Sequence, residues 1–169
     1  MTPYRELLIG CGRDKRKRYA LDGTNGNWTN VVTLDYDERC DPDILHDLRL
    51  LPYPFQDEWF DEIHAYEVLE HVGKQGDYKF FFAQFTEFHR ILKPGGHMLI
   101  TVPRWDSVWA WGDPGHTRVL NEGTFAFLDQ ANYGKQDTMT DYRDYYKVSF
   151  GAQLVTKNEH SMVVLLWKK

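Results

Sequence analysis

The sequence predicts an α/β fold, with a Rossmann-like, doubly wound and mainly parallel sheet that ends in an antiparallel C-terminal hairpin. Short apolar runs of strand length alternate with longer connecting segments, and one of these connections has clear helical spacing. Two further apolar runs follow each other near the end of the chain. Strands separated by a helical crossover pair in parallel, whereas strands joined directly pair antiparallel.

Four apolar runs are expected to form the parallel strands. Most of them are flanked by Gly, Pro or Asp, which end regular structure. The runs span residues 6–9, 31–34, 63–66 and 97–102. The two terminal strands of the hairpin are expected over residues 142–150 and 162–167, where aromatic and β-branched side chains gather.

The connections differ in regularity. A helix is expected over residues 77–92, where Phe81, Phe85 and Phe88 recur at helical spacing before a Lys-Pro-Gly-Gly turn ends the pattern. A second, short helix is expected to begin at Asn121, because asparagine is a preferred N-cap residue.

Residues 13–30 show no sustained helical period, so the first crossover is expected to be irregular. This segment contains a dense basic run, residues 13–18, which is either a solvated loop or a contact for an anion. The whole chain carries a formal net charge of -5, which argues against broad electrostatic capture of nucleic acid.

Length and composition limit the remaining possibilities. A chain of 169 residues is enough for one domain, which we expect to span residues 1–169. No apolar stretch approaches the roughly 20 residues that a membrane span requires, and the N-terminus lacks the features of a signal peptide. We therefore expect a cytoplasmic protein that does not contact a membrane. The two cysteines do not indicate a disulfide framework, and no feature indicates an oligomeric state.

Four features of the sequence fall where parallel strands are expected to end. In open parallel sheets the ligand crevice lies beyond these carboxyl ends. The first feature is Gly10-Cys11-Gly12, whose small residues either let backbone amides approach a ligand or serve only a tight turn. The second is Asp35, followed by Tyr36. A carboxylate at this place accepts hydrogen bonds from both hydroxyls of a ribose, unless it faces solvent in a turn.

The third and fourth features follow the next two apolar runs. Asp47 can accept a hydrogen bond from an adenine amino group beside the apolar wall of Leu48, or it can cap a turn. Tyr66 is the last residue of the strand expected at 63–66, and Glu67 and His71 follow it. If this segment is helical, Glu67 and His71 share a face and can position or deprotonate a substrate.

Together these motifs resemble those of class I S-adenosylmethionine-dependent methyltransferases, especially the short bacterial and phage-type group related to the methyltransferase 11 family. The matching motifs are LLIGCG, VVTLDYD, HDLRLLPYPFQDEWFDEIHAYEVLEHV and FHRILKPGGHMLITVP. The resemblance covers residues 6–103 and continues more loosely through GDPGHTRVLNEGTFAFL. Each motif alone is weak evidence, but four in order at compatible spacing are specific.

The resemblance implies S-adenosyl-L-methionine as the cofactor. Gly10 and Gly12 would face its methionine part, and Asp35 would face its ribose. Asp47 and Leu48 would contact the adenine. The family often has a third glycine two residues after the second, whereas this chain has an aspartate there. The full expected set of cofactor-binding residues is Gly10, Cys11, Gly12, Asp35, Tyr36, Asp47, Leu48 and Tyr66.

Methyl transfer from a sulfonium mainly requires alignment of the nucleophile and exclusion of water. A base helps when the acceptor is a hydroxyl or a protonated amine, and the candidates are Glu67, His71 and His116, in falling order. We expect no metal site, because the reaction requires none and the seven histidines are scattered. Residues 105–111 are expected near the acceptor, beside His116 and Arg118, as either an aromatic lid or an apolar plug.

Two other interpretations remain open. A nicotinamide enzyme of the same fold would also use Asp35, but residues 10–15 do not form a G-x-G-x-x-G fingerprint. A non-catalytic binding or assembly module could also keep the fold. The favoured function is methyl transfer to an unidentified acceptor, with a small molecule or a sugar preferred.

Overall fold

The computed structural model describes residues 3–21, 26–135, 139–157 and 159–169. The strands are β1 (Glu6–Ile9), β2 (Val31–Asp35), β3 (Ile44–Leu45), β4 (Phe60–Tyr66), β5 (Leu92–Pro103), β6 (Phe150–Lys157) and β7 (Ser161–Lys168). The α-helices within these ranges are α1 (Tyr78–Ile91), α2 (Val108–Gly112) and α3 (Glu122–Ala126). The 3-10 helices there are η1 (Glu38–Cys40), η2 (Leu69–His71) and η3 (Gln130–Asn132).

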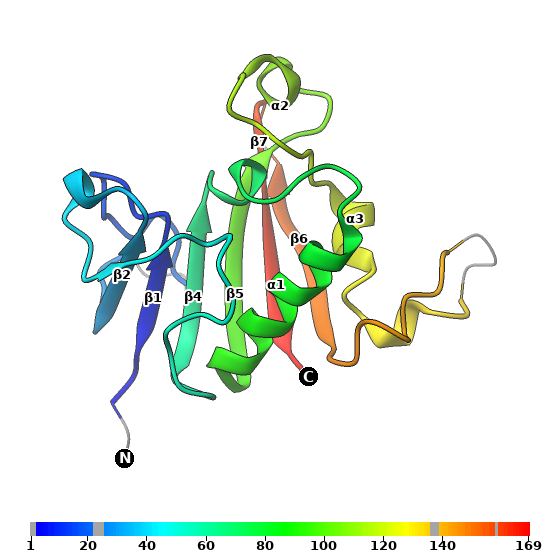
Figure 1. Ribbon diagram of the computed structural model, residues 1–169, viewed down its shortest axis with the longest axis horizontal. Helices are drawn as coiled ribbons and strands as arrows, with labels where there is room; N and C mark the ends of the chain where they lie inside the picture. Colours follow the sequence, from blue (N-terminus) through cyan, green and yellow to red (C-terminus); the bar gives the residue numbers. More distant parts are fainter. Residues whose placement is uncertain (1–2, 22–25, 136–138, 158) are drawn as a thin grey trace.

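The strands form one seven-stranded sheet in the order β3-β2-β1-β4-β5-β7-β6 (Figure 1). Strands β1 to β5 pair in parallel, whereas β7 runs antiparallel to both β5 and β6. The predicted mainly parallel sheet with an antiparallel C-terminal edge is therefore confirmed. Among the helices of the described ranges, none has both the length and the apolar character needed to cross a membrane.

Helix α1 covers one face of the sheet (Figure 1). It forms where the sequence predicts a helix, because the carboxylate of Asp77 caps it by accepting a hydrogen bond from the Phe80 amide. Its inner face buries Phe85 and Phe88 completely, and each such burial contributes about 2–3 kcal/mol. Helix α3 begins at Glu122, and Asn121 caps it as predicted, through a capping box with the third residue of the helix.

The strand predicted over residues 142–150 is wrong. The outer strand of the hairpin is β6, which starts at Phe150 and pairs with β7. Residues 142–149 are irregular, and their aromatic side chains hold them against α1. Tyr146 is fully buried, and its ring packs against that of Phe82. The aromatic residues that suggested a strand are therefore anchors of a loop.

The first crossover covers the opposite face of the sheet. Within its described parts, residues 13–21 and 26–30, there is no helix, in agreement with the sequence. Tyr19, Leu21 and Trp28 pack against a small apolar cluster that β1, β4, β5 and β7 supply on this face. A loop thus takes the place that a crossover helix commonly fills in such folds.

Candidate functional site

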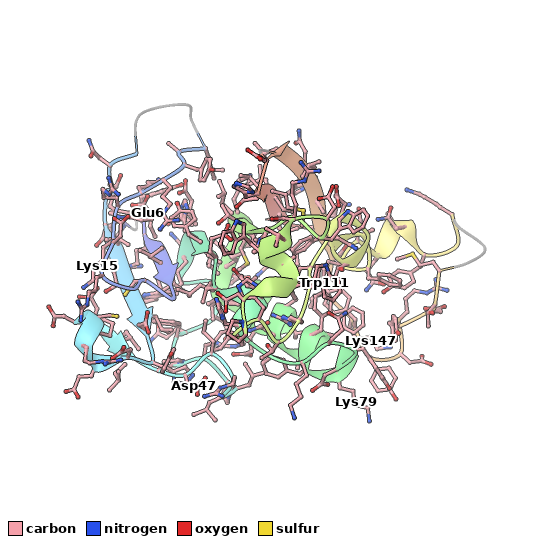
Figure 2. The ribbon with its side chains drawn as sticks, turned by 90° about the horizontal axis from the view of Figure 1, so that it is seen from above. Glu6, Lys15, Asp47, Lys79, Trp111 and Lys147 are labelled. Atoms are coloured by element: carbon pink, nitrogen blue, oxygen red, sulfur yellow. The ribbon has the colours of Figure 1, made fainter. Side chains whose placement is uncertain are left out.

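A cleft of about 600 Å³ opens at the carboxyl ends of β1 to β4. The strand order reverses between β1 and β4, and open α/β sheets bind their ligands at this point. Figure 2 looks down on this edge of the sheet and shows Asp47 among its side chains. The lining residues are Gly10, Leu34, Asp35, Tyr36, Asp37, Cys40, His46, Asp47, Leu48, Arg49, Val68, His71, Val72, Gly115 and Thr117.

Asp35 joins two loops at the floor of this cleft. It is the last residue of β2 and only 6% exposed. One carboxylate oxygen accepts a hydrogen bond from the Gly12 amide at 2.9 Å, and the other accepts from the Asp37 amide at 3.0 Å. A carboxylate has about four acceptor positions, so Asp35 can still accept from the hydroxyls of a ligand.

The two glycines after β1 are required for different reasons. Both have a positive φ, +57° at Gly10 and +54° at Gly12, which glycine adopts without steric cost. A Cβ atom at Gly10 would lie 2.2 Å from Cγ2 of Val68, whereas one at Gly12 would meet no atom within 4 Å. Gly10 therefore permits close packing on Val68, and Gly12 leaves open space beside its backbone.

We expect Gly10→Ala to destabilise the protein more than Gly12→Ala. Both variants place alanine at a positive φ, which costs roughly 1–2 kcal/mol. Gly10→Ala adds the clash with Val68, and overpacking of this kind costs about 1–3 kcal/mol more. Urea unfolding of the two variants measures the difference, and equal losses of stability would contradict the packing argument.

Asp47 and Leu48 form a second wall of the cleft. Asp47 accepts hydrogen bonds from the backbone amide of Arg49 at 2.9 Å and from its guanidinium at 2.6 Å. The Arg49 guanidinium lowers the pKa of Asp47. Leu48 is buried, and its carbonyl accepts a hydrogen bond from the Tyr53 hydroxyl at 3.2 Å. Asp47 thus caps a turn and lines the cleft at the same time.

Two of the expected cofactor residues point their side chains elsewhere. Cys11 and Tyr66 belong to the apolar cluster on the opposite face of the sheet. The Tyr66 hydroxyl bonds to Nδ1 of His64 at 2.7 Å, and neither residue lines the cleft. Tyr36 does line the cleft, with 73% of its surface exposed.

The structure brings two of the three candidate bases together, His71 and His116. The helical turn expected to align Glu67 with His71 does not form, because η2 begins only at Leu69 and Glu67 has a φ of 53°. That expectation is corrected. His71 lines the cleft and bonds through Nδ1 to the Gly115 carbonyl at 3.0 Å. His116 lies beside it, with the two ring centroids 4.6 Å apart.

Glu70 is a neighbour of this histidine pair that the sequence analysis did not select. It is 2% exposed, and burial raises the pKa of its carboxyl to about 8. Neither of its carboxylate oxygens has a hydrogen-bond partner among the described residues. A glutamate directly before His71 was visible in the sequence, but its proximity to His116 was not.

A buried polar cluster on the opposite face of the sheet was also not predicted from the sequence. The ammonium group of Lys17 donates to Glu6 at 2.5 Å and to Glu62 at 3.0 Å, and its side chain is 7% exposed. His64 bonds to the same Glu62 carboxylate at 2.8 Å. The basic run at 13–18 is therefore not wholly a solvated loop. The sequence signal for this cluster was the presence of two acidic residues, Glu6 and Glu62, in or beside the apolar runs that form β1 and β4.

Of the two alternatives for the loop after β5, an aromatic lid or an apolar plug, the plug does not form. Trp105, Trp109 and Trp111 are 52%, 56% and 70% exposed. Helix α2, which carries Trp111, stands above the carboxyl edge of the sheet (Figures 1 and 2). Arg118 is instead buried, and its guanidinium bonds to the Leu69 carbonyl and to the Gln84 side chain. Arg118 therefore supports the core and does not face the cleft.

Comparison with known proteins identifies the family. Residues 7–100 match the methyltransferase 11 family, described as a methyltransferase domain. The chain belongs to this methyltransferase family. The match covers β1 to most of β5 and includes every residue that lines the cleft except Gly115 and Thr117.

Relatives of this methyltransferase domain agree with that assignment. It is 30% identical over 148 residues to a probable S-adenosylmethionine-dependent methyltransferase of Mycolicibacterium smegmatis. That match covers 79% of this chain and 53% of the other protein, so the chain spans about half the length of this curated relative.

Two solved structures show the same fold. A SAM-dependent methyltransferase from Archaeoglobus fulgidus has a TM-score of 0.64 at 13% identity, covering 99% of this chain and 87% of that one. The 1,6-didemethyltoxoflavin-N1-methyltransferase of Burkholderia thailandensis, with 1,6-didemethyltoxoflavin and S-adenosylhomocysteine bound, has a TM-score of 0.57 at 18% identity. This match covers 99% of this chain and 72% of that one. At these identities the likeness shows the fold alone.

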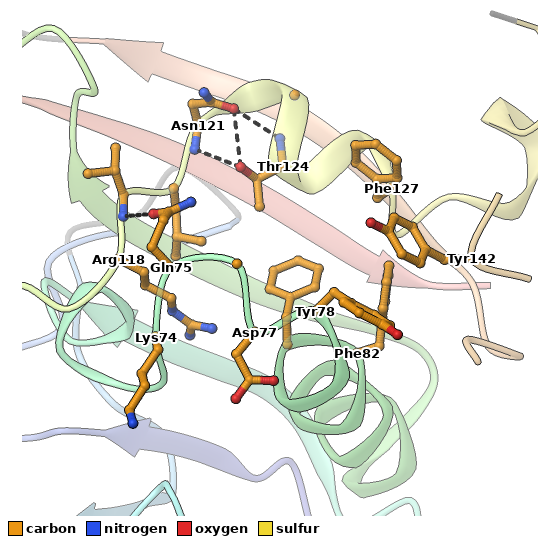
Figure 3. Close-up of a pocket in the computed structure, with 15 residues that line it drawn as sticks. Lys74, Gln75, Asp77, Tyr78, Phe82, Arg118, Asn121, Thr124, Phe127 and Tyr142 are labelled. Atoms are coloured by element: carbon orange, nitrogen blue, oxygen red, sulfur yellow. Dashed lines mark hydrogen bonds between the residues drawn. The ribbon is translucent and has the colours of Figure 1, made fainter. Parts of the chain in front are cut away.

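The methyltransferase domain has a second pocket, of about 370 Å³, beside α1 (Figure 3). Five of its fifteen lining residues are aromatic, and Tyr78, Phe82, Phe127 and Tyr142 are among them. Asn121 and its capping hydrogen bonds stand at one side. This pocket shares no lining residue with the cleft at the strand ends, so the two are separate.

Proposed function

We propose that this chain binds S-adenosylmethionine in the cleft at the ends of β1 to β4 and transfers its methyl group to a small hydroxylated molecule or a sugar. One observation carries the proposal: Asp35 and Asp47 line a single cleft, and the Gly12 amide bonds to the Asp35 carboxylate at its floor. Its volume of about 600 Å³ lies within the roughly 300–1,000 Å³ of small-molecule sites.

The residues in and beside the cleft suit the ribose, the adenine and the methionine part of this cofactor. Asp35 stands at the end of the second strand, where sheets of this type hold a ribose, and it retains acceptor capacity for both hydroxyls. Asp47, fixed by Arg49, would accept from the adenine amino group beside Leu48. The open space beside Gly12 would admit the methionine part.

The acceptor would enter from the side of the cleft that His71 lines. The bound cofactor supplies a methyl group already activated by its sulfonium, so the chain has to align the acceptor and exclude water. The Gly115 carbonyl accepts a hydrogen bond from Nδ1 of His71, so Nε2 keeps its lone pair. His71 is therefore better placed than Glu67 to receive a proton from an acceptor hydroxyl, which revises the order expected from the sequence.

Calorimetric titration with S-adenosylhomocysteine tests the cofactor part of the proposal. We expect one micromolar site per chain in the wild type. Asp35→Ala should weaken it by at least about 100-fold, because it removes the acceptor for the ribose and for the Gly12 amide.

Asp57→Ala is the matched control, because Asp57 is an exposed aspartate that contacts only Arg90 among the ion pairs of the described residues. It should bind S-adenosylhomocysteine as the wild type does. A folded wild type that binds none, or an Asp35→Ala variant that binds as tightly as the control, would contradict the proposal.

A further inference from the structure

Three side chains with metal-ligating atoms meet beside the cleft: Glu70, His71 and His116. One ligand atom from each lies within 4.8 Å of the others. Glu70 and His71 belong to η2, after β4, whereas His116 lies in the segment between α2 and α3. The backbone holds the two segments together, because the Thr117 amide donates to the Glu70 carbonyl at 2.9 Å.

The buried atoms of this cluster have no partners among the described residues. Both carboxylate oxygens of Glu70 lack a hydrogen bond, although the residue is 2% exposed, and so does Nδ1 of His116. Buried polar atoms in native proteins nearly always have a partner. The nearby cation of Arg118 bonds to the Leu69 carbonyl and to Gln84 instead. A carboxylate and an imidazole that both offer lone pairs indicate a bound cation as the missing partner.

The two histidines are oriented as metal ligands commonly are. Nδ1 of His71 faces the Gly115 carbonyl at 3.0 Å, and a carbonyl only accepts, so this nitrogen carries the proton and Nε2 carries the lone pair. For His116 the roles are reversed: Nε2 lies 3.8 Å from the Asp113 carboxylate, and Nδ1 is the nitrogen without a partner. Metal-binding histidines typically present one nitrogen while the other faces a carbonyl or a carboxylate.

We propose that Glu70, His71 and His116 bind one divalent transition-metal ion of the zinc, cobalt or ferrous class at the wall of the cleft. Two imidazoles and one carboxylate suit these ions, whereas magnesium and calcium prefer oxygen ligands. This departs from the expectation of no metal site, which rested on the wide spacing of the histidines along the chain.

Because the cluster lies at the wall of the cleft, a bound ion would contact a molecule in the cleft. His71 is exposed and lines the cleft, so the ion has an accessible side there. Three protein ligands leave a position for water or for a substrate oxygen. A metal ion held there would make a bound acceptor hydroxyl more acidic, so that its proton would pass to solvent and its oxygen would receive the methyl group. In that case His71 would be a ligand, and the role of base given to it above would apply to the metal-free chain alone. This statement about the acceptor rests on the proposed function, whereas binding of the metal does not.

Titration of the chelator-treated full chain with Co²⁺ tests the site, followed by visible absorption and calorimetry. We expect one saturable Co²⁺ per chain at micromolar affinity. Glu70→Gln and His116→Gln should each weaken it by at least about tenfold, since each removes one of three ligands. Glu58→Gln and His160→Gln are matched controls at exposed positions and should leave the affinity unchanged.

Three results would overturn the metal site. They are no saturable binding to the wild type at millimolar Co²⁺, unchanged affinity in folded Glu70→Gln, and a loss of affinity in His160→Gln equal to that in His116→Gln. If the Glu70 or His116 variants fail to fold, X-ray absorption of the Zn²⁺-loaded wild type decides. Scattering from two imidazoles supports the site, and scattering from fewer than two overturns it.

Titration of the same samples with S-adenosylhomocysteine separates this proposal from the proposed function. Metal binding without S-adenosylhomocysteine binding supports the metal site and contradicts the methyltransferase proposal. The opposite result overturns the metal site alone. Methyl transfer to a hydroxylated acceptor that stops on chelation and returns with Zn²⁺ or Co²⁺ supports the acceptor statement, and transfer that is indifferent to chelation overturns it.

Discussion

Replacing Lys17 by methionine is expected to lower the free energy of unfolding by about 3–5 kcal/mol, because it leaves buried carboxylates without their cation. Lys17 donates to Glu6 and to Glu62, which are 0% and 5% exposed and lie side by side on β1 and β4. Methionine keeps most of the length of the side chain but cannot neutralise either charge. The loss of stability is therefore mainly electrostatic.

The same cluster predicts sensitivity to acid. Burial by itself raises the pKa of Glu62, but hydrogen bonds from His64, Tyr4 and Lys17 lower it to about 2, from an ordinary value of 4.5. Between these values the unfolded chain binds more protons than the folded one, so stability is lost as the pH falls from about 4.5 to about 2. Without Lys17 the pKa of Glu62 should rise, and the acid dependence should become shallower.

Urea unfolding at neutral pH and at about pH 3.5, within the window set by the Glu62 pKa, measures both effects. Lys15→Met is the matched control. Lys15 lies in the same segment, but its ammonium group bonds to the Asp41 carbonyl at the surface. Its loss should cost less than about 1 kcal/mol. If Lys15→Met and Lys17→Met lose the same stability, the buried cluster does not contribute as proposed.

Much of the sheet follows from local features of the sequence. β1 has the predicted bounds, and the helix predicted over 77–92 matches α1 together with its two capping residues. Asn121 caps α3 as expected. These successes share one cause: apolar periodicity and the residues that end it are properties of neighbouring positions. The place of the cleft followed in turn from the strand order that such units impose.

Features that depend on distant contacts could not be predicted in this way. Residues 142–149 have the composition of a strand, but Tyr146 is held against Phe82, more than sixty positions earlier. The pairing of Lys17 with Glu62 depends on how an irregular loop folds back over the sheet. His71 and His116 meet only because β4 and β5 end at the same edge. Spacing along the chain carries no signal for any of these contacts.

Replacing Arg118 is expected to lower the free energy of unfolding by about as much as replacing Lys17. Arg118 is 5% exposed, and burial lowers the pKa of its guanidinium to about 10. Nε donates to the Leu69 carbonyl at 2.8 Å, and Nη2 donates to the Gln84 side chain at 2.7 Å. Arg118→Met leaves both acceptors buried without a donor, at about 1–3 kcal/mol each. We therefore expect a loss of about 3–5 kcal/mol in stability.

A series of hydrogen bonds also connects Arg118 to the wall of the cleft. The Gln84 amide donates to the Tyr53 hydroxyl at 3.1 Å, which donates to the carbonyl of Leu48, a residue of the cleft wall. Folded Arg118→Met should therefore bind S-adenosylhomocysteine about tenfold more weakly, although the guanidinium does not line the cleft. Arg118→Lys should rescue neither property, because a lysine ammonium cannot reproduce the two-pronged geometry.

Arg143→Met separates this role from a general effect of losing an arginine. Arg143 pairs with Asp141 at the surface, where both side chains are more than half exposed, so its loss should cost less than about 1 kcal/mol. Urea unfolding and calorimetry on both variants distinguish the two positions. If Arg118→Met is as stable as Arg143→Met, the buried guanidinium does not hold η2 against α1. If it is unstable but binds S-adenosylhomocysteine normally, the connection through Tyr53 does not fix the cleft wall.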